Sequence, residues 1–146
     1  MSGGGQGAVF GLTGLDHVVL RVEDAPRVIA FYVEVIGCTL ERTQAEIGLY
    51  QLRAGRSIID IVPVDGVLGR AGGAPPGAEA RNLDHFALGV APFDEAAIRA
   101  HLAAHGVEVL ESGQRYGAEG FGPSVYFKDP AGNVVELKGP SSGALG

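Results

Sequence analysis

The chain has 146 residues, of which 46% are hydrophobic and 19% are charged, so it can build the core of one domain or of two small fused modules. Its net charge of -6 and the lack of a basic stripe argue against a nucleic-acid binder. No apolar run approaches about 18 residues, and the first residues lack a basic start followed by an apolar stretch, so we expect neither a membrane span nor a secretory signal.

The ends of the chain and its cysteine give weaker information. The Gly-rich residues 1–13 predict a flexible N-terminal arm, and residues 140–146 predict a C-terminal tail. Cys38 is the only cysteine, so no disulfide can form within the chain, and we interpret it as a small buried apolar side chain. A chain without disulfides fits the reducing cytoplasm, which is the location that we predict.

Residues 14–64 carry the pattern of a first βαβββ module. The stretch LDHVVLRV at 15–22 alternates in the manner of a strand. Asp24 is a suitable N-cap for a helix whose apolar residues keep helical spacing up to Gly37, which is expected to end it. Three strand-like runs follow at 38–43, 47–53 and 57–62.

Residues 83–139 repeat this order after a linker at 65–82 that is rich in Gly, Ala and Pro. LDHFALGV at 83–90 predicts a strand, Asp94 is expected to cap a helix, and Gly106 is expected to end it. The remaining strand-like runs lie near 107–111, 123–128 and 133–138.

Two further stretches connect the strands of the second module. DPAGN at 129–133 predicts a tight turn, with Pro and Gly in suitable positions. SGQRYGAEGFG at 112–122 is rich in glycine and lacks periodicity, so we interpret it as a loop at the mouth of a site. This loop is expected to hold the residues by which the second copy is longer than the first.

The two modules also agree in detail at their first and last strands. LDHVVLRV and LDHFALGV are identical at five of eight positions, and SIIDI matches NVVEL in chemical type at every position. Because strand side chains alternate between two faces, His17 and Asp60 leave their strands on the face opposite their apolar neighbours. His85 and Glu136 do the same in the second module.

Two imidazoles and two carboxylates on equivalent faces make the donor set of a divalent metal site. Neutral imidazole with carboxylate suits Zn, Ni, Co, Mn or Fe(II). A single strand histidine is usually structural and a single acid on a polar face is usually solvated, so the equivalent placement in both modules carries the prediction. We predict that the ligands are His17, Asp60, His85 and Glu136.

Neighbouring acids and histidines have a simpler interpretation. Asp16 and Asp84 fall on the other strand face, where local hydrogen bonding at the strand start is expected. His101 and His105 have an i, i+4 spacing that can bind metal, but they lack a carboxylate partner in a matching motif. They lie in the last turns of a helix, where histidine interacts favourably with the helix dipole.

With these motifs the chain resembles the vicinal oxygen chelate superfamily, the group of glyoxalase I, the bleomycin-resistance proteins and the extradiol dioxygenases. The resemblance implies an α+β fold in which two βαβββ modules curl into an eight-stranded mixed sheet that forms a cup around a metal. It implies that the four predicted ligands take the metal positions, that the substrate is a small molecule, and that the chain forms a homodimer. The motifs cover about residues 14–139 and are LDHVVLRV, FYVEVIGC at 31–38, LDHFALGV, and VYFKDPAGNVVELKGP at 125–140.

The resemblance also implies roles in substrate binding. Arg21 matches an arginine that contacts the glutathione carboxylate in glyoxalase I, although arginine also occurs there in members that use no glutathione, and it can equally be a solvated residue at a strand end. Arg115, Tyr116 and Phe121 are predicted to close over a substrate, unless their stretch is a plain surface connection. Tyr126 is predicted to support the reacting centre, although its strand pattern also suits packing on both faces.

Asp60 departs from the pattern of glyoxalase I, which usually carries Glu or Gln in this place. Asp is shorter by one methylene, so it either binds through water or leaves the position open. A site of His17, His85 and Glu136 alone would be the two-histidine, one-carboxylate triad that the resemblance associates with Fe(II) dioxygenases and Mn-dependent thiol transferases.

Three functions follow from the resemblance. The first is a glyoxalase-like lyase or isomerase acting on vicinal oxygens, in which Glu136 or Asp60 moves the proton on a carbon next to a carbonyl. The second is an extradiol-type Fe(II) dioxygenase. The third is a metal-free binding protein of the bleomycin-resistance type, against which the four retained ligand types count.

Overall fold

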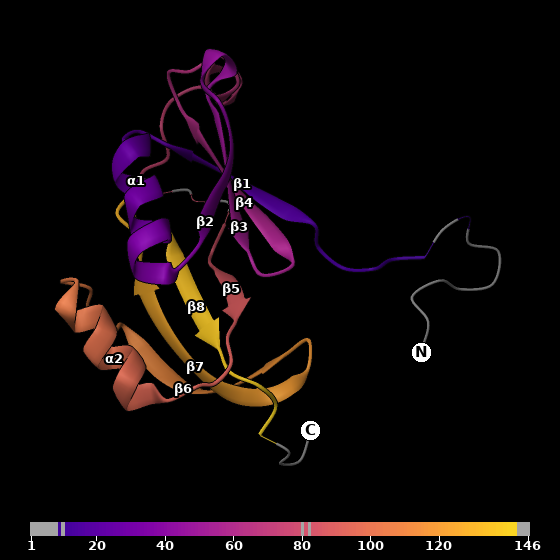
Figure 1. Ribbon diagram of the computed structural model, residues 1–146, viewed down its shortest axis with the longest axis vertical. Coiled ribbons are helices and arrows are strands. Elements are labelled where there is room, and N and C mark those ends of the chain that lie inside the picture. The colour runs from indigo at the N-terminus through magenta and orange to yellow at the C-terminus, as the bar shows by residue number, and fades with distance from the viewer. Residues whose placement is uncertain (1–8, 10, 80, 82, 143–146) are drawn as a thin grey trace.

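The computed structural model describes residues 9, 11–79, 81 and 83–142, and it contains two four-stranded mixed sheets (Figure 1). Their strand orders are equivalent, β1-β4-β3-β2 and β5-β8-β7-β6, with one parallel pair in each sheet. The predicted α+β fold of two βαβββ modules is confirmed, but within one chain the two sheets do not join into a single closed cup. The elements are β1 His17–Val22, α1 Ala25–Phe31, a π-helical segment Tyr32–Ile36, β2 Thr39–Gln44, β3 Leu49–Ala54, β4 Ser57–Pro63, β5 Phe86–Gly89, α2 Glu95–Ala104, β6 Glu111–Gly117, β7 Gly120–Lys128 and β8 Val134–Lys138, with short 3₁₀ turns at Ala45–Ile47 and Gly69–Gly72.

The helices begin and end where the sequence predicts. The Asp24 carboxylate accepts a hydrogen bond from the Arg27 amide, and Asp94 accepts one from Ala97 in the same way. Gly37, with φ of 96°, follows the first helical stretch in the left-handed conformation that a non-glycine residue rarely adopts. The helix before it widens into π-type bonding in its last five residues, which the sequence did not indicate.

The predicted loop at 112–122 is wrong, because these residues form the end of a β-hairpin. β6 and β7 pair in unbroken register from Glu111 opposite Tyr126 to Gly117 opposite Gly120. The predicted strand at 107–111 correspondingly starts only at its last residue. The glycines that suggested a loop lie inside strands.

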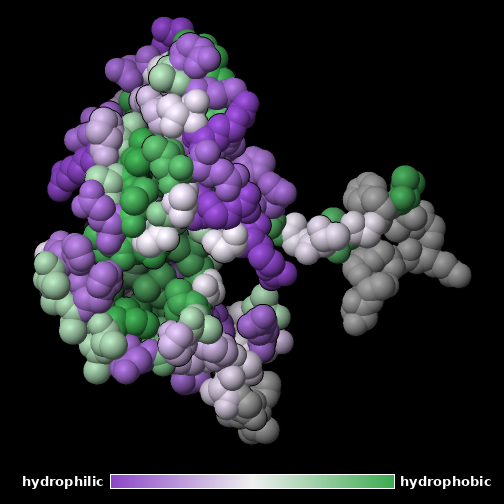
Figure 2. All heavy atoms as spheres, in the orientation of Figure 1, coloured by the Kyte–Doolittle hydropathy of each residue, from purple (hydrophilic) through white to green (hydrophobic). Residues whose placement is uncertain are grey.

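One hydrophobic core is shared by the two modules. It contains residues from β1, α1 and β4 of the first module together with α2, β7 and β8 of the second. Phe31 of α1 lies against Phe127 of β7, with ring centroids 6.3 Å apart. In Figure 2 the apolar side chains gather where α1 meets the second module. The faces that carry the predicted ligands are therefore the faces turned away from this core.

The linker between the modules is held by Arg21. Its guanidinium donates hydrogen bonds to the carbonyl oxygens of Gly69, Gly73 and Ala74 at 2.6 to 3.3 Å. Gly72 lies so close that an added Cβ would meet the Arg21 Nε at 2.2 Å. The lack of a side chain at this glycine lets the guanidinium reach the linker carbonyls.

We expect Gly69→Ala to lower the free energy of unfolding by about 1–3 kcal/mol, the usual cost of overpacking. A Cβ at this buried position would lie 1.9 Å from the Pro63 carbonyl oxygen, so the backbone must move. Gly77→Ala is the matched control, since a Cβ there meets nothing within 4 Å. Urea unfolding followed by circular dichroism measures both changes, and equal losses would contradict the expectation.

The predicted arm at 1–13 and tail at 140–146 fall largely outside the described residues. Within the described part of the tail, the Ser142 amide donates to the Phe121 carbonyl at 2.8 Å. Among the described residues, no helix has the length and apolar character needed to cross a membrane.

Candidate metal-binding half-sites

The first predicted pair lies on adjacent strands of the first sheet. His17 begins β1, and Asp60 is in β4, opposite Val19 in the parallel ladder. The His17 Nε2 is 4.0 Å from Asp60 Oδ2. The Asp60 residue is only 5% exposed, whereas the His17 side chain is 48% exposed, so the imidazole is open to solvent beside a buried carboxylate.

The second pair is tighter. His85 directly precedes β5, and its Nε2 is 3.1 Å from Oε1 of Glu136 in β8. The other carboxylate oxygen, Oε2, accepts a hydrogen bond from the buried Ser124 hydroxyl at 2.5 Å. A cavity of about 320 Å³ opens beside this pair and is lined by His85, Glu111 and Tyr126 among others. A carboxylate longer by one methylene thus reaches its histidine more closely than Asp60 does.

Each histidine is oriented by the aspartate that precedes it. His17 Nδ1 is 2.8 Å from Asp16 Oδ1, and His85 Nδ1 is 2.8 Å from Asp84 Oδ2. These hydrogen bonds are the main reason that the pKa of both imidazoles is raised from the usual value. The predicted local hydrogen bonding of the two aspartates is confirmed. With Nδ1 held by the aspartate, Nε2 is the nitrogen that faces the carboxylate of the same module, and a metal ion bound there would take the place of its proton.

The two pairs do not meet within one chain. Among residues 9, 11–79, 81 and 83–142, no three His, Cys, Asp or Glu side chains lie together in a group that could hold a metal ion. Two His-carboxylate pairs are therefore present as separate candidate half-sites on two sheets, and each has the donor types that suit a divalent cation.

Two predicted substrate-binding residues lie at the second half-site. The Tyr126 ring is edge-on to the His85 ring with centroids 5.4 Å apart, and the Arg115 guanidinium lies 5.4 Å from the centre of the Tyr126 ring. Burial raises the pKa of the Tyr126 hydroxyl, Glu136 raises it further, and Arg115 opposes the shift. This side of the second sheet thus combines an imidazole, a carboxylate, a phenol and a guanidinium.

The other predicted substrate-binding residues lie elsewhere. Tyr116 and Phe121 face each other near the end of the hairpin, with ring centroids 5.0 Å apart. In the regular ladder they alternate with Arg115, which places them on the opposite side of the sheet. The Arg21 guanidinium is bound to linker carbonyls. Contact of these three residues with a substrate stays a prediction.

Three residues at the half-sites were missed in the sequence. Ser124 bonds to Glu136, as described above. Gln51 donates from Nε2 to Asp60 Oδ1 at 3.1 Å, and Arg42 donates to the Gln51 Oε1 at 3.1 Å. A polar residue at alternate positions of a strand is the only signal that could have pointed to them, and this signal is common on solvated sheet faces.

The pair of helix histidines has a structural contact. His101 Nε2 lies 2.7 Å from the Val35 carbonyl oxygen, so it connects α2 to the π-helical segment of the first module. The rings of His101 and His105 are 4.9 Å apart. These contacts fit the sequence interpretation, in which the two residues are not ligands.

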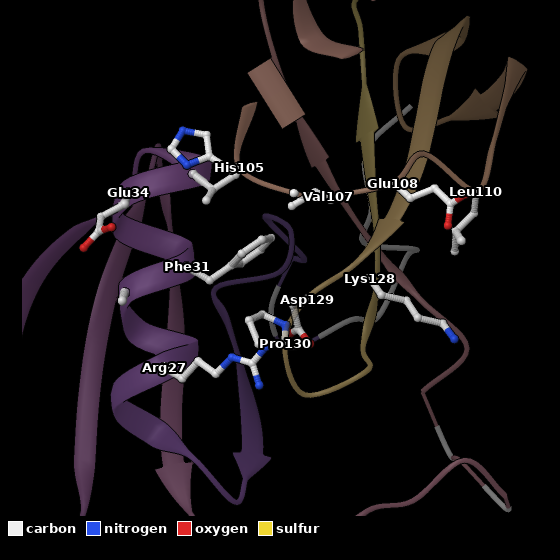
Figure 3. Close-up of a pocket in the computed structure, with 13 residues that line it drawn as sticks. Arg27, Phe31, Glu34, His105, Val107, Glu108, Leu110, Lys128, Asp129 and Pro130 are labelled. Carbon is white, nitrogen blue, oxygen red and sulfur yellow. The ribbon is translucent and has the colours of Figure 1, made fainter. Parts of the chain in front are cut away.

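A larger cavity of about 510 Å³ lies between α1 and the segment that precedes β6 (Figure 3). Arg27 and Phe31 of α1 line one side, and His105, Lys128 and Asp129 come from the second module. None of the four predicted ligands lines it. The cavity is a space between the modules, apart from both half-sites.

Comparison with known proteins agrees with this architecture. Among solved structures, an integron cassette protein from V. cholerae is 28% identical, with 91% of this chain and 99% of the other covered and a TM-score of 0.69. The fosfomycin resistance protein FosX from Listeria monocytogenes is 21% identical, with 90% and 96% covered and a TM-score of 0.65. Lactoylglutathione lyase from Agrobacterium tumefaciens is 18% identical, with 92% and 98% covered and a TM-score of 0.62.

The last two likenesses are of fold alone, given their low identity. No curated protein matches the chain. The family described as the Glyoxalase/Bleomycin resistance protein/Dioxygenase superfamily matches residues 14–137, which include both modules and both half-sites. The chain therefore belongs to the Glyoxalase/Bleomycin resistance protein/Dioxygenase superfamily.

Proposed function

We propose that the protein is a metal-dependent, glyoxalase-like enzyme that acts on a small substrate with two adjacent oxygens. The observation that supports this most directly is the repeated His-carboxylate pair, which occurs at the equivalent place of both modules with the second nitrogen of each histidine held by an aspartate. An imidazole whose Nδ1 is held by a carboxylate and whose Nε2 faces the site is the usual form of a histidine ligand. The donor types suit Zn, Ni, Co, Mn or Fe(II).

The complete site is proposed to form between two chains. His17 and Asp60 of one chain would face His85 and Glu136 of a second chain, because the two pairs of one chain lie on separate sheets turned away from the shared core. β1 and β5 are both edge strands of their sheets, so the strands that carry the histidines are open to a partner. A homodimer with two such sites satisfies two-fold symmetry.

The residues of the chain have distinct tasks in this proposal. A bound divalent ion would supply a positive charge that stabilises an oxyanion on the substrate. Glu136, which is buried beside His85, would take the proton from the carbon next to a carbonyl, and Asp60 is the other candidate for this role. Tyr126 interacts with Glu136, and Arg115 lies over the Tyr126 ring, so both would be candidates to orient a substrate oxygen.

An extradiol-type Fe(II) dioxygenase is the second candidate, because a tyrosine lies directly beside a predicted ligand in the Tyr126–His85 contact. Anaerobic loading with iron, followed by oxygen uptake with catechols, would distinguish it from a lyase or isomerase. If the protein is a lyase or isomerase, we instead expect a substrate proton to exchange for deuterium in D₂O without oxygen consumption.

We expect the purified protein to bind one divalent ion per chain, and we expect His17→Ala and His85→Ala each to weaken binding by more than about a hundredfold. This exceeds the loss usual for removing a supporting partner of a ligand. Titration calorimetry of the metal-free protein with Mn(II) and Zn(II) measures the affinities, and His105→Ala is the control. Absence of any bound ion, with small-molecule binding unchanged in His17→Ala, would instead indicate a metal-free binding protein.

A further inference from the structure

A row of three side chains crosses the first sheet and ends at Asp60. Arg42 in β2 lies opposite Gln51 in β3, which lies opposite Asp60 in β4. The Arg42 Nη1 donates to the Gln51 Oε1, and the Gln51 Nε2 donates to the Asp60 Oδ1, both at 3.1 Å. Neighbouring residues on three strands thus form one continuous hydrogen-bonded chain that leads to the first half-site.

The direction of this chain is fixed by chemistry. A guanidinium can only donate hydrogen bonds, and an ionised carboxylate can only accept them. The amide of Gln51 must therefore turn its oxygen to Arg42 and its nitrogen to Asp60, because a flipped amide would place two donors and two acceptors face to face. The arginine also polarises the amide, which strengthens the hydrogen bond that the amide gives to the carboxylate.

The two half-sites differ in their need for such support. Glu136 contacts its histidine at 3.1 Å and also accepts the Ser124 hydroxyl. Asp60 is shorter, stands 4.0 Å from the His17 Nε2, and has Gln51 as the side chain that holds its Oδ1. With Oδ1 held, Oδ2 is the oxygen turned toward the histidine.

We propose that Gln51, itself held by Arg42, is a positioning residue that keeps Asp60 in the pose needed to bind the metal. This inference rests on the proposed metal-dependent function and adds to it an outer contact for the short carboxylate. It also gives Asp60 a role as a direct ligand, because an oriented and buried carboxylate is suited to bind without a water between.

If the Arg42–Gln51–Asp60 row only held the strands together, other side-chain pairs between the same strands would have the same effect. Arg53 follows two residues after Gln51 in the same strand, and it forms a two-bond ion pair with Glu41 of β2 at 2.9 and 3.1 Å. This pair also joins β2 to β3 and is separate from the hydrogen-bonded row that ends at Asp60, and partly exposed pairs of this kind add little stability. Arg53→Leu is therefore the matched control for a loss of strand-to-strand contact.

The test compares Gln51→Leu, Arg42→Leu and Arg53→Leu with the wild-type protein. Calorimetry with Mn(II) measures metal affinity, and the visible absorption of the Co(II)-loaded protein reports the geometry of the ligands. We expect Gln51→Leu to weaken Mn(II) binding by about 10- to 100-fold, the range found when the outer partner of a ligand is removed. Arg42→Leu should cause a smaller loss, and Arg53→Leu should leave the affinity and the Co(II) spectrum unchanged.

The outcomes separate this inference from the proposed function. If the wild type binds metal but neither Gln51→Leu nor Arg42→Leu changes the affinity or the Co(II) spectrum, the positioning role is overturned and the metal enzyme stands. If the wild type binds no divalent ion, both proposals fail. Arg42 is exposed, so Arg42→Leu keeps the test open should Gln51→Leu fail to fold. An equal loss in Arg53→Leu would also overturn the role, since it would indicate a general effect on the sheet.

Discussion

Two variants that each lack metal sites are expected to regain about a quarter of the wild-type sites when their chains are mixed in equal amounts. The first variant carries His17→Ala with Asp60→Asn, and the second carries His85→Ala with Glu136→Gln. If each site combines the first module of one chain with the second module of the other, each homodimer is defective at both sites. A mixed dimer has one site with four intact ligands and one site with none.

The measurement needs chains that exchange or are made together. Co-expression with two different affinity tags, followed by purification through both, isolates the mixed dimer, whose bound metal should approach one ion per two chains. Each variant co-expressed with a differently tagged copy of itself is the control. A doubly tagged dimer without bound metal would contradict a site shared between chains, whereas a wild-type protein that stays monomeric and binds metal would place all four ligands in one chain.

Much of the candidate metal site can be predicted from the sequence repeat, because successive side chains of a strand point to opposite faces of the sheet. Once His17 and Asp60 are assigned to strands with apolar neighbours on the other face, their common side of the sheet follows, and His85 with Glu136 repeats the argument. The helix limits at Asp24 and Gly37 were predictable for a similar reason, since capping and left-handed residues act locally.

The arrangement of the two modules could not be predicted in this way. It depends on the packing of Phe31 against Phe127, residues that lie far apart in the chain and carry no local signal for one another. The resemblance to a known family implies a cup but leaves open whether it forms within one chain or across two, and only the tertiary packing reveals two sheets that do not join within one chain.

The hairpin that was interpreted as a loop shows how glycine can mislead. A Cβ at Gly117 would lie 2.7 Å from the Lys138 side chain, and one at Gly113 would lie 2.6 Å from the Arg115 guanidinium. These glycines allow long side chains to cross the sheet surface, which is the close-approach role of strand glycine. A glycine in a loop and a glycine at a close approach within a strand cannot be told apart in the sequence.

The support of Asp60 was hidden by a strand irregularity. The register of β2 against β3 shifts between Leu40 and Arg42, and this shift is what sets Arg42 opposite Gln51. A regular ladder would have placed the arginine beside another residue. No pattern in the sequence marks the position of the shift.

We expect Asp129→Ala to lower the free energy of unfolding by about 3–5 kcal/mol, the largest loss that we predict for a single substitution. Asp129 is buried in the turn between β7 and β8, and its Oδ2 accepts the Tyr32 hydroxyl at 2.6 Å. Its Oδ1 accepts the amides of Ala131 and Asn133, both at 2.9 Å. Removal of the carboxylate leaves one buried hydroxyl, two backbone amides and the Asn133 side-chain amide without this partner, and it cuts a contact between the two modules.

The contact between modules can be tested separately with Tyr32→Phe, which removes only the hydroxyl that reaches Asp129 and should cost about 1–2 kcal/mol. Burial and the neighbouring Asp129 keep the pKa of the Tyr32 hydroxyl far above its ordinary value, so the phenol remains a donor throughout the range of working pH. Tyr116→Phe is the control, since that side chain is 70% exposed and should lose almost nothing. Urea unfolding should yield the order Asp129→Ala, Tyr32→Phe, Tyr116→Phe from largest loss to smallest. If Tyr32→Phe lost no more free energy of unfolding than the control, the Tyr32–Asp129 hydrogen bond would not be stabilising the packing of the first module on the second. The shared apolar core alone would then have to fix the direction in which the two half-sites face.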